Sequence, residues 1–456
     1  SEPLQKAIGL QPGAPLVDFI RGDRSLEGQF GWRERGGLLG DFIDSTPVVA
    51  GAAKEPQLDL LPGVGASYGD YLREVKARRP RVIYAGANDG MLHAFRDGAG
   101  SDGSPPGREI FAYLPRAVAG QLGQLRDPDY ARTTDTHRFF VDGPLRLADV
   151  HVPPPGGGAP VWRNYLFGST GAGPAAVFAL DVTDPAALGS GSVRWEIRGE
   201  SDARLGHVLA PVATGMLPNG TWVALFGNGW GSQSKTAQLF VVELQSCTVH
   251  AIPLPEPASA QDANGLGGVA LRKNGQGQVV GAYAGDLAGR LWRFDYSEND
   301  AAFFRIGLGG QPLFQAPAGQ AIMQAPWLQS TGQGFRLAFG TGRLITDEDA
   351  KDRAVQAVYV VEDREGESLS RPLLPEQLEA RVLSALPQKD APRATTYYQV
   401  SNPAIDWTRK RGWSLNLTGP DIPQGLRVLQ PLQSVTQGSD LLLVAAEAPA
   451  VAGDPC

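Results

Sequence analysis

The chain has 456 residues, of which 58 are glycine and 36 are proline, and its formal net charge at pH 7 is −7. This much glycine and proline is unusual for a helical protein and natural for short strands joined by tight turns. The hydrophobic fraction of 42% is sufficient for a packed core and excludes a disordered chain. A negative net charge without a polybasic run predicts neither a nucleic-acid partner nor binding to anionic lipid.

The chain ends also carry information. No apolar run reaches the roughly 18 residues needed for a transmembrane helix, so we predict no membrane span. The first residues, SEPLQKAIG, contain neither a start Met nor a signal peptide, so we expect an excised fragment of a longer protein, and the missing signal says nothing about export. The stretch 21–37 is rich in arginine, and we interpret it as a solvated surface rather than a ligand site.

One pattern recurs along the chain: an apolar strand, a turn containing glycine, and a second strand that often ends in an acid. Repetition of one strand hairpin predicts a repeat architecture. In the first copy, Asn88, Asp89 and Gly90 form the turn, because these residue types tolerate a positive φ. The five copies are RVIYAGANDGMLHAFRD (81–97), NYLFGSTGAGPAAVFALDVTD (164–184), WVALFGNGWGSQSKTAQLFVVEL (222–244), VVGAYAGDLAGRLWRFD (279–295) and FRLAFGTGRLITDEDAKDRAVQAVYVVED (335–363).

Less regular strands are expected at 45–51 and as a pair at 411–417 and 440–448. Helical periodicity is scarce, and we predict helices only at 68–79, 115–127 and 375–386. Hairpins repeated along one chain favour an all-β fold, a modified β-propeller of about seven blades with a few short helices in inter-blade insertions. We expect residues 1–456 to form a single propeller domain. A pair of β-sandwiches is the alternative, but the repeated unit is a hairpin and not a Greek key.

Several motifs, taken in order, resemble one family. They are RGDRS (21–25), LLGDFIDSTPVVAG (38–51), FFVDGPLRLADVHV (139–152), GSTGAGPAAVFALDVTDP (168–185), LGHVLAPVATGMLPNGTWVALFGNGWGS (205–232), YAGDLAGRLWRFD (283–295), AFGTGRL (338–344), RGWSLNL (411–417) and the terminal DPC. Together they resemble the C-terminal β-propeller of the PilC/PilY family of type IV pilus tip adhesins. Each piece alone is unspecific, whereas the ordered set is specific.

The resemblance implies a non-enzymatic domain of a pilus biogenesis factor. Such proteins are exported through the periplasm to the pilus tip and cell surface, where they sit with minor pilins. They support pilus extension, twitching motility and attachment to host or abiotic surfaces. A variable N-terminal region, absent here, precedes the propeller in that family.

Many members of that family also carry an EF-hand-like calcium loop just before the strand that matches YAGD. In this chain the glycines of the loop remain, but the carboxylates that calcium needs do not. We therefore predict a β-turn without tight calcium binding and no cofactor. The aligned ligand positions are Arg272, Asn274, Gln276 and Val280.

Three further motifs invite a functional interpretation. Asp347, Asp349 and Asp352 in DEDAKD could hold calcium, but the EF-hand glycine and distal Glu are missing, so a solvated hairpin tip is favoured. Arg21–Gly22–Asp23 could bind an integrin, yet a local ion pair or turn explains it better. The two cysteines, Cys247 and Cys456, are a candidate disulfide.

The main alternative function is a quinone-dependent dehydrogenase, which also uses a propeller. That enzyme needs a buried calcium site of Glu, Asn and Asp, a catalytic Asp and commonly an adjacent Cys pair. This chain has no adjacent cysteines and none of the regular AxDxxTGxxxW repeats of such enzymes. A third hypothesis is a scaffold that stacks against other pilus components and has no surface target.

Overall fold

The computed structural model describes residues 15–100, 103–133, 136–154, 156–255, 263–386, 397–435 and 441–449. Contacts divide these residues into two compact units. Unit 1 consists of the described residues within Ser1–Lys235, Val241–Val249 and Gly275–Gln278. Unit 2 consists of those within Thr236–Phe240, His250–Asn274 and Val279–Cys456. Whether the two units act as a single propeller domain stays a prediction.

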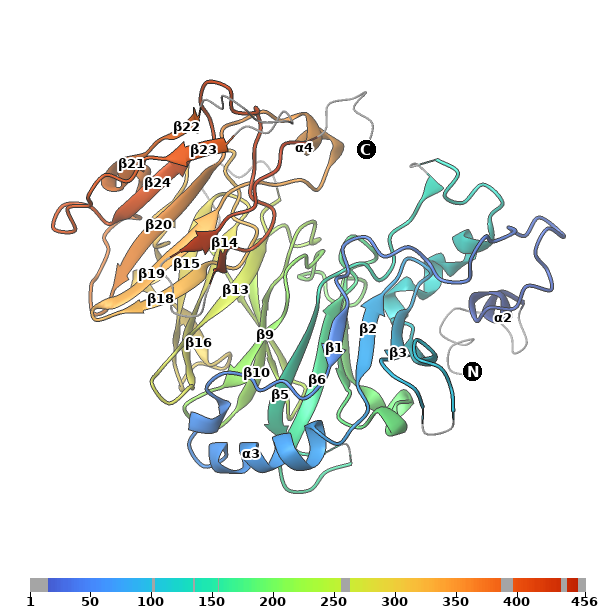
Figure 1. The fold of residues 1–456 in the computed structure, drawn as a ribbon. Coiled ribbons are helices and arrows are strands. Elements are labelled where there is room, and N and C mark those ends of the chain that lie inside the picture. Colours follow the sequence, from blue (N-terminus) through green and yellow to red (C-terminus); the bar gives the residue numbers. More distant parts are fainter. Residues whose placement is uncertain are drawn as a thin grey trace. The chain divides into compact units, whose positions relative to one another are not determined.

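Two four-stranded antiparallel sheets lie wholly in unit 1 and follow the chain order of their strands (Figure 1). The first contains β1 (Val48–Ala50), β2 (Val82–Gly86), β3 (Leu92–Arg96) and β4 (Glu109–Tyr113). The second contains β5 (Leu145–Val152), β6 (Val161–Ser169), β7 (Ala176–Asp181) and β8 (Val193–Arg198).

A third four-stranded sheet has the order β12-β11-β10-β9. Its strands are β9 (Ala213–Met216), β10 (Trp222–Gly227), β11 (Gln238–Glu243) and β12 (Val249–Pro253). All three of these sheets are short meanders in which each strand pairs with its neighbour in sequence, as a repeated hairpin unit requires.

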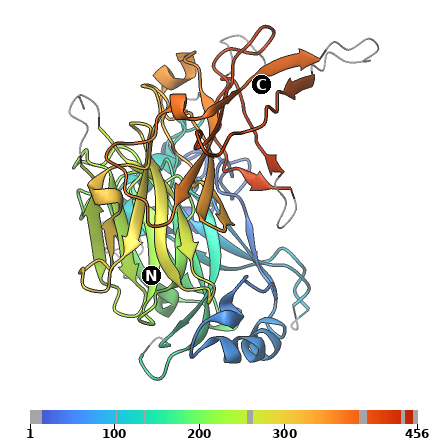
Figure 2. The ribbon, with the colours of Figure 1, turned by 90° about the vertical axis from the view of Figure 1, so that its left-hand side faces the viewer.

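Unit 2 holds two five-stranded sheets, whose central strands run side by side in Figure 2. The first contains β13 (Leu266–Lys273), β14 (Val279–Asp286), β15 (Arg290–Tyr296), β16 (Phe304–Ile306) and β17 (Phe314–Gln315). The second has the order β18-β19-β20-β24-β21, with β18 (Trp327–Thr331), β19 (Gly334–Gly340), β20 (Ala357–Arg364), β21 (Glu379–Arg381) and β24 (Gly412–Asn416). Two small ribbons pair β22 (Leu383–Leu386) with β23 (Tyr397–Val400), and β25 (Gln433–Ser434) with β26 (Leu442–Leu443).

All five hairpins predicted from the sequence are confirmed, and each supplies two neighbouring strands near the middle of a sheet. Strands β7 and β10 are buried at every position, because both of their faces are covered. The turn at Asn88–Gly90 is also confirmed, and Gly90 adopts a φ of 100° there. The all-β prediction holds, whereas the number of blades stays a prediction.

Helical segments are short. The prediction at 68–79 is confirmed by α3 and η3, and the one at 115–127 by η4. The segments are α2 (Pro15–Ile20), η1 (Leu58–Leu60), η2 (Gly65–Ser67), α3 (Tyr68–Tyr71), η3 (Leu72–Lys76), η4 (Arg116–Arg126), η6 (Pro185–Ala187), η7 (Ser190–Ser192), η8 (Leu308–Gly310), α4 (Asp347–Lys351) and η9 (Pro375–Gln377). Among the described residues, no helix is long and apolar enough to cross a membrane.

Two sequence predictions are wrong. The helix expected at 375–386 is only the turn η9 followed by β21 and β22, because β21 pairs in parallel with β24 and tertiary pairing overrides the local helical pattern. The strands expected at 411–417 and 440–448 do not pair with each other. Instead β24 pairs with β20, and β26 pairs with β25.

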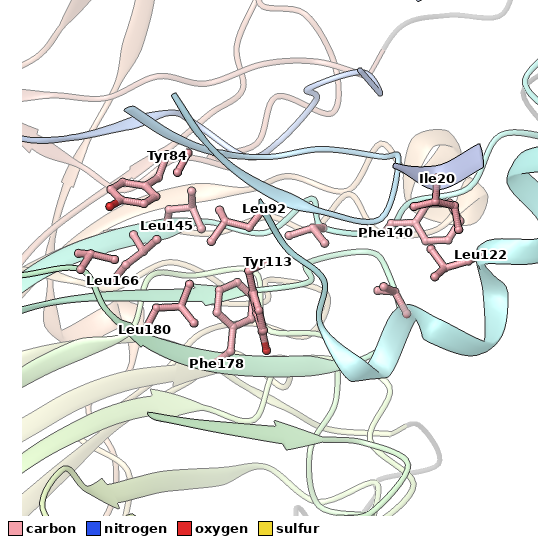
Figure 3. Packing of buried hydrophobic residues seen from close by; sticks show 14 of the residues in the cluster. Ile20, Tyr84, Leu92, Tyr113, Leu122, Phe140, Leu145, Leu166, Phe178 and Leu180 are labelled. Atoms are coloured by element: carbon pink, nitrogen blue, oxygen red, sulfur yellow. The ribbon is translucent and has the colours of Figure 1, made fainter. Parts of the chain in front are cut away.

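The first two sheets share one hydrophobic core with α2 and η4 (Figure 3). Tyr113 from β4 meets Phe178 from β7 edge to face, with ring centroids 5.1 Å apart. Leu92 and Leu166 are about 1% exposed or less, so both sheets bury their apolar faces against this core. Unit 2 has two cores of its own, one around Tyr283 and Phe339 and the other around Val358 and Val428.

A buried polar network fixes the helical segment of residues 54–79 to the second sheet. The carboxylate of Asp149 on β5 accepts hydrogen bonds from Lys76 Nζ (2.7 Å) and Tyr68 Oη (2.6 Å). Asn164 Nδ2 on β6 donates a third bond of 2.8 Å. Figures 1 and 2 show the helical segment in blue at the bottom of each view. Each charged group is satisfied, so the ion pair can be buried without a large penalty.

Replacing Lys76 by Met tests this network. The variant leaves the buried Asp149 carboxylate without its cation, so we expect a loss of about 3 kcal/mol in the free energy of unfolding. Urea unfolding followed by circular dichroism measures the loss. Lys54→Met is the matched control, because the Lys54–Asp59 pair is exposed and should contribute less than about 1 kcal/mol. Equal losses in the two variants would contradict a special role for the buried pair.

Candidate functional site

The loop predicted as a degenerate calcium site is the turn between β13 and β14. Lys273 pairs with Val279 and Arg272 with Gly281, with a bulge between the two pairs. Gly277 adopts a φ of 78°, which favours glycine. A Cβ on Gly277 would also lie 2.7 Å from the carbonyl oxygen of Gln57. Gly277 thus serves the turn and its close packing, and the β-turn predicted from the sequence is confirmed.

Arg272 occupies the first ligand position of this loop with a positive charge. Its Nη2 donates to the Val280 carbonyl oxygen at 3.1 Å and to Asp295 Oδ1 on β15 at 2.6 Å. The side chain is only 11% exposed. A Cβ on Gly281 would lie 2.6 Å from Arg272 Nε, so this glycine makes room for the guanidinium above β14.

Asp295 connects Arg272 to further charges. Its Oδ1 also accepts from Arg293 Nε at 2.8 Å. Arg293 Nη1 lies 3.3 Å from both oxygens of Asp363 on β20, and Tyr283 Oη donates to Asp363 Oδ2 at 2.5 Å. Burial and the Asp363 charge raise the pKa of Tyr283, so the hydroxyl stays protonated and donates. Burial opposes the charge of Arg293, but the bonds to its carboxylates raise the pKa of its guanidinium.

These residues do not fit a calcium ion. The Val280 carbonyl and the Asp295 carboxylate are oxygens of the type that calcium binds, but the Arg272 guanidinium already contacts both. Two arginines balance two carboxylates in the network, so an added divalent cation would meet no excess negative charge. The guanidinium acts as a cation that is covalently attached to the hairpin.

The acidic motif DEDAKD forms the short helix α4 and not a solvated hairpin tip. Thr346 is its N-cap, and the Asp349 side chain accepts from the Thr346 amide at 3.0 Å, completing a capping box. Arg343 Nε donates to the other Asp349 oxygen at 2.8 Å. Although burial opposes ionisation, these bonds lower the pKa of Asp349. Asp352 accepts from the Ala354 amide at 2.8 Å, so both carboxylates have structural partners.

Within the described ranges, no three His, Cys, Asp or Glu side chains are grouped closely enough to hold a metal ion. The structure therefore does not bring Asp347, Asp349 and Asp352 together as ligands. Asp286 is fully buried and accepts from Arg290 Nε (2.7 Å) and Trp292 Nε1 (2.9 Å).

The motif Arg21–Gly22–Asp23 forms a turn after α2. The sequence favours a local ion pair or a turn over an integrin-binding motif, and the turn is confirmed. The amide of Asp23 donates to the Asp18 carbonyl at 2.9 Å, and Gly22 has a φ of 104°. The Asp23 carboxylate accepts from the Ser25 amide at 2.7 Å, and this bond lowers its pKa. Both Arg21 and Asp23 are exposed, and integrin binding stays a prediction.

The candidate disulfide stays a prediction, since Cys456 lies outside the described residues. Cys247 is in the turn after β11, with its Sγ 3.7 Å from the carbonyl oxygen of Arg194. Burial raises the pKa of the Cys247 thiol, so at neutral pH it is not a reactive thiolate.

The sequence prediction missed a cavity of about 940 Å³ in unit 1. Its walls are residues of the stretch between Phe19 and Asp41, the β2–β3 turn at Asn88 and Asp89, and residues between Leu125 and His137. We call it the Arg33 cavity. The stretch 21–37 was interpreted as a solvated surface, which is wrong in part: Arg35 is 7% exposed and ion-paired with Glu27 at 2.6 Å. Two arginines flanked by glycines at 31–37 were the available signal.

Asn88, which lines the Arg33 cavity, is hydrogen-bonded to a buried acid. Asp142 is 2% exposed, and its Oδ1 accepts from the Asp44 amide at 3.1 Å and from Asn88 Nδ2 at 3.4 Å. Its Oδ2 is buried and has no partner among the described residues. Burial raises the pKa of Asp142 to about 6. The carboxyl group is therefore poorly accommodated in its charged form.

Comparison with known proteins places this geometry in a family. Sheets built as short meanders are typical of β-propeller blades. Residues 39–372 match the family model described as the PilY1 β-propeller domain. The chain therefore belongs to the PilY1 β-propeller family.

Curated relatives and a solved structure agree. Type IV pilus biogenesis factor PilY1 of Pseudomonas aeruginosa (strain PAK) is 33% identical over 475 residues, covering 96% of this chain and 39% of that protein. A PilY1 homolog of Xylella fastidiosa (strain Temecula1) is 36% identical over 361 residues, covering 77% of this chain and 27% of that protein. The crystal structure of the Pseudomonas aeruginosa PilY1 C-terminal domain aligns with a TM-score of 0.71 and 28% identity, covering 88% of this chain and 83% of that one.

The chain thus spans less than half the length of the curated relatives it matches. A quinohemoprotein alcohol dehydrogenase from Comamonas testosteroni aligns at 12% identity with a TM-score of 0.30, which is too low to support any argument.

The ionisation of Asp142 predicts a pH effect on stability. Its native pKa of about 6 lies above the ordinary value of 3.8, so the folded state binds the proton more tightly, and stability is lost as pH rises from 3.8 to about 6. Asp142→Asn removes that charge and should stabilise the chain at pH 7.5 by up to about 3 kcal/mol.

Thermal unfolding of both proteins at pH 4 and at pH 7.5 checks this effect. The gain should nearly vanish at pH 4, where the native carboxyl group is already neutral. A variant that is no more stable than the wild type at pH 7.5 would show that the buried carboxylate is better solvated than the structure indicates.

Proposed function

We propose that this chain is the propeller part of a type IV pilus biogenesis factor and tip adhesin. Supporting this, proteins named type IV pilus biogenesis factor PilY1 align with 96% of the chain, and the crystal structure of a PilY1 C-terminal domain shares its fold. The full protein would support pilus assembly and extension, twitching motility and attachment to surfaces.

The proposed partners are minor pilins of the pilus tip complex and a host or abiotic surface. The protein would be exported, pass through the periplasm and reside at the pilus tip on the cell surface. The names of the relatives support an association with the pilus, and the partners at the tip are inferred from that association.

We propose a binding and assembly role without catalysis. The buried charges of the β13–β15 hairpins are paired with one another, as expected for structural groups and not for an acid or base kept ready for substrate. The alternative of a quinone-dependent dehydrogenase is favoured by no observation, since the described residues contain no group of three acids, histidines or cysteines suited to a metal.

We also propose that the propeller does its work without local calcium. The observation that carries this is the contact of the Arg272 guanidinium with Val280 and Asp295. A loop that holds its own cation keeps one conformation whether or not calcium is present. Calcium can shift a conformational equilibrium only if it binds one conformation more tightly than another.

Gene deletion tests the pilus function. In the organism of origin, loss of the full-length protein should abolish surface pili and twitching, and the wild-type gene should restore both. Electron microscopy of pili and twitching zones on agar are the measurements. Undiminished pili and twitching would contradict the proposal, whereas a bound quinone absorbance in the purified protein would favour the dehydrogenase.

A further inference from the structure

The Arg33 cavity contains a cation that has no direct ion pair among the described residues. The main chain of Arg33 is fixed by the bond from its amide to the Arg126 carbonyl oxygen, at 2.7 Å. Its guanidinium lies over the Tyr130 ring, 4.5 Å from the centroid. Within the described part of the chain, the guanidinium has no hydrogen-bonding or carboxylate partner, and its Nε is buried. A buried donor left unpaired costs free energy that a ligand could recover.

The neighbouring Arg35 has a structural role, because its guanidinium is fully engaged in contacts within the protein. Arg35 donates to Glu27 Oε1 at 2.6 Å and to the carbonyl oxygens of Phe19 (2.7 Å) and Asp23 (2.8 Å). Arg33 lines the same cavity two residues earlier but has none of these bonds. Packing of the fold therefore accounts for Arg35 and leaves the guanidinium of Arg33 available.

Main-chain groups next to Arg33 are available too. Residues 36–39 line the cavity and are exposed, and among the described residues their amide and carbonyl groups have no hydrogen-bonding partner. The pattern changes at Gly40, whose amide donates to Asp89 Oδ2 at 2.9 Å. Free peptide groups along a cavity wall can pair with the main chain of another polypeptide.

Large apolar side chains are exposed on this wall and at positions near it in the sequence. Isolated exposed apolar residues are ordinary, but a cluster of them on one surface marks an interaction site. Leu38 and Leu39 line the cavity, and four further exposed apolar residues are close in sequence to residues that line it. The exposed residues are Phe30 (87%), Leu38 (49%), Leu39 (49%), Phe42 (42%), Ile43 (53%) and Phe139 (37%).

We infer that the Arg33 cavity binds an extended segment of a partner protein that carries a carboxylate flanked by apolar side chains. The carboxylate pairs with Arg33 in a charge-assisted, bidentate contact, and the peptide groups of the segment pair with residues 36–39. The apolar flanks cover Leu38, Leu39 and their neighbours. Because the chain as a whole carries a net charge of −7, an acidic segment is attracted by this local cation and not by the general surface.

A peptide fits these groups better than a sugar or a small anion. A small anion would use Arg33 and leave the apolar rim uncovered. A saccharide stacks on the open face of an aromatic ring, but Arg33 covers Tyr130 and Arg126 lies 5.3 Å from the Trp32 ring centroid. The inference does not depend on the pilus function, since it rests on the cavity alone.

Selection from a phage library of random linear peptides, panned on the whole chain, tests the inference. Enriched peptides should contain Asp or Glu beside apolar residues. The synthetic form of the best peptide should bind the wild type, and its affinity for Arg33→Gln should fall at least tenfold by calorimetry, because an unpaired acid would be left in the cavity. Affinity for Leu38→Asp should fall as well, because the added charge repels the peptide.

Arg132→Gln is the matched control. Arg132 lines the same cavity, but it is exposed and paired with Asp129, so its loss should change affinity less than about threefold. Circular dichroism and melting temperature establish that each variant is folded. The inference is overturned if no peptide is enriched, if the selected peptide binds Arg33→Gln as tightly as the wild type, or if sialyllactose binds the cavity more tightly than any peptide.

Discussion

Burial of the central strands on both faces is the constraint on which this structure depends. Strands such as β7 and β10 leave no side exposed to water, so every polar group near their ends needs a partner inside the protein. Buried acids in the sheets meet this requirement with arginines, lysines and tyrosines. Asp149 binds Lys76, and Asp286 binds Arg290. The apolar strands specify the sheets. Buried ion pairs such as Asp149–Lys76 then fix the segments between strands to the sheets.

The Arg272 network is the same solution in the turn between β13 and β14, the loop predicted to be a degenerate calcium site. A guanidinium fixed between a carbonyl oxygen and a carboxylate supplies the positive charge that the hairpin end requires. It needs no ion from solution, and its position is set by the absence of a side chain at Gly281. A turn without carboxylates and an arginine with two oxygen partners are thus parts of one arrangement. These contacts support the proposal that calcium does not control this hairpin.

The central hairpins could be predicted from the sequence, because strands buried on both faces read as continuous apolar runs around glycine turns. Edge strands such as β4 and β21 are half exposed and short, so their patterns are weak. The helix expected at 375–386 was wrong for that reason, since only pairing with β24 decides its structure. The Arg33 cavity could not be predicted either. It is made by three segments far apart in the chain, and no local pattern records which arginine the fold leaves unpaired.

Calcium titration most directly tests the claim that Arg272 replaces a bound cation. Calorimetry and melting temperature should be compared for the wild type and for the triple variant Arg272→Asp, Asn274→Asp, Gln276→Asp. The account predicts no heat and no shift for the wild type, and binding with a raised melting temperature for the variant, since a ligand of the native state stabilises it by mass action. Micromolar calcium binding by the wild-type hairpin would contradict the account.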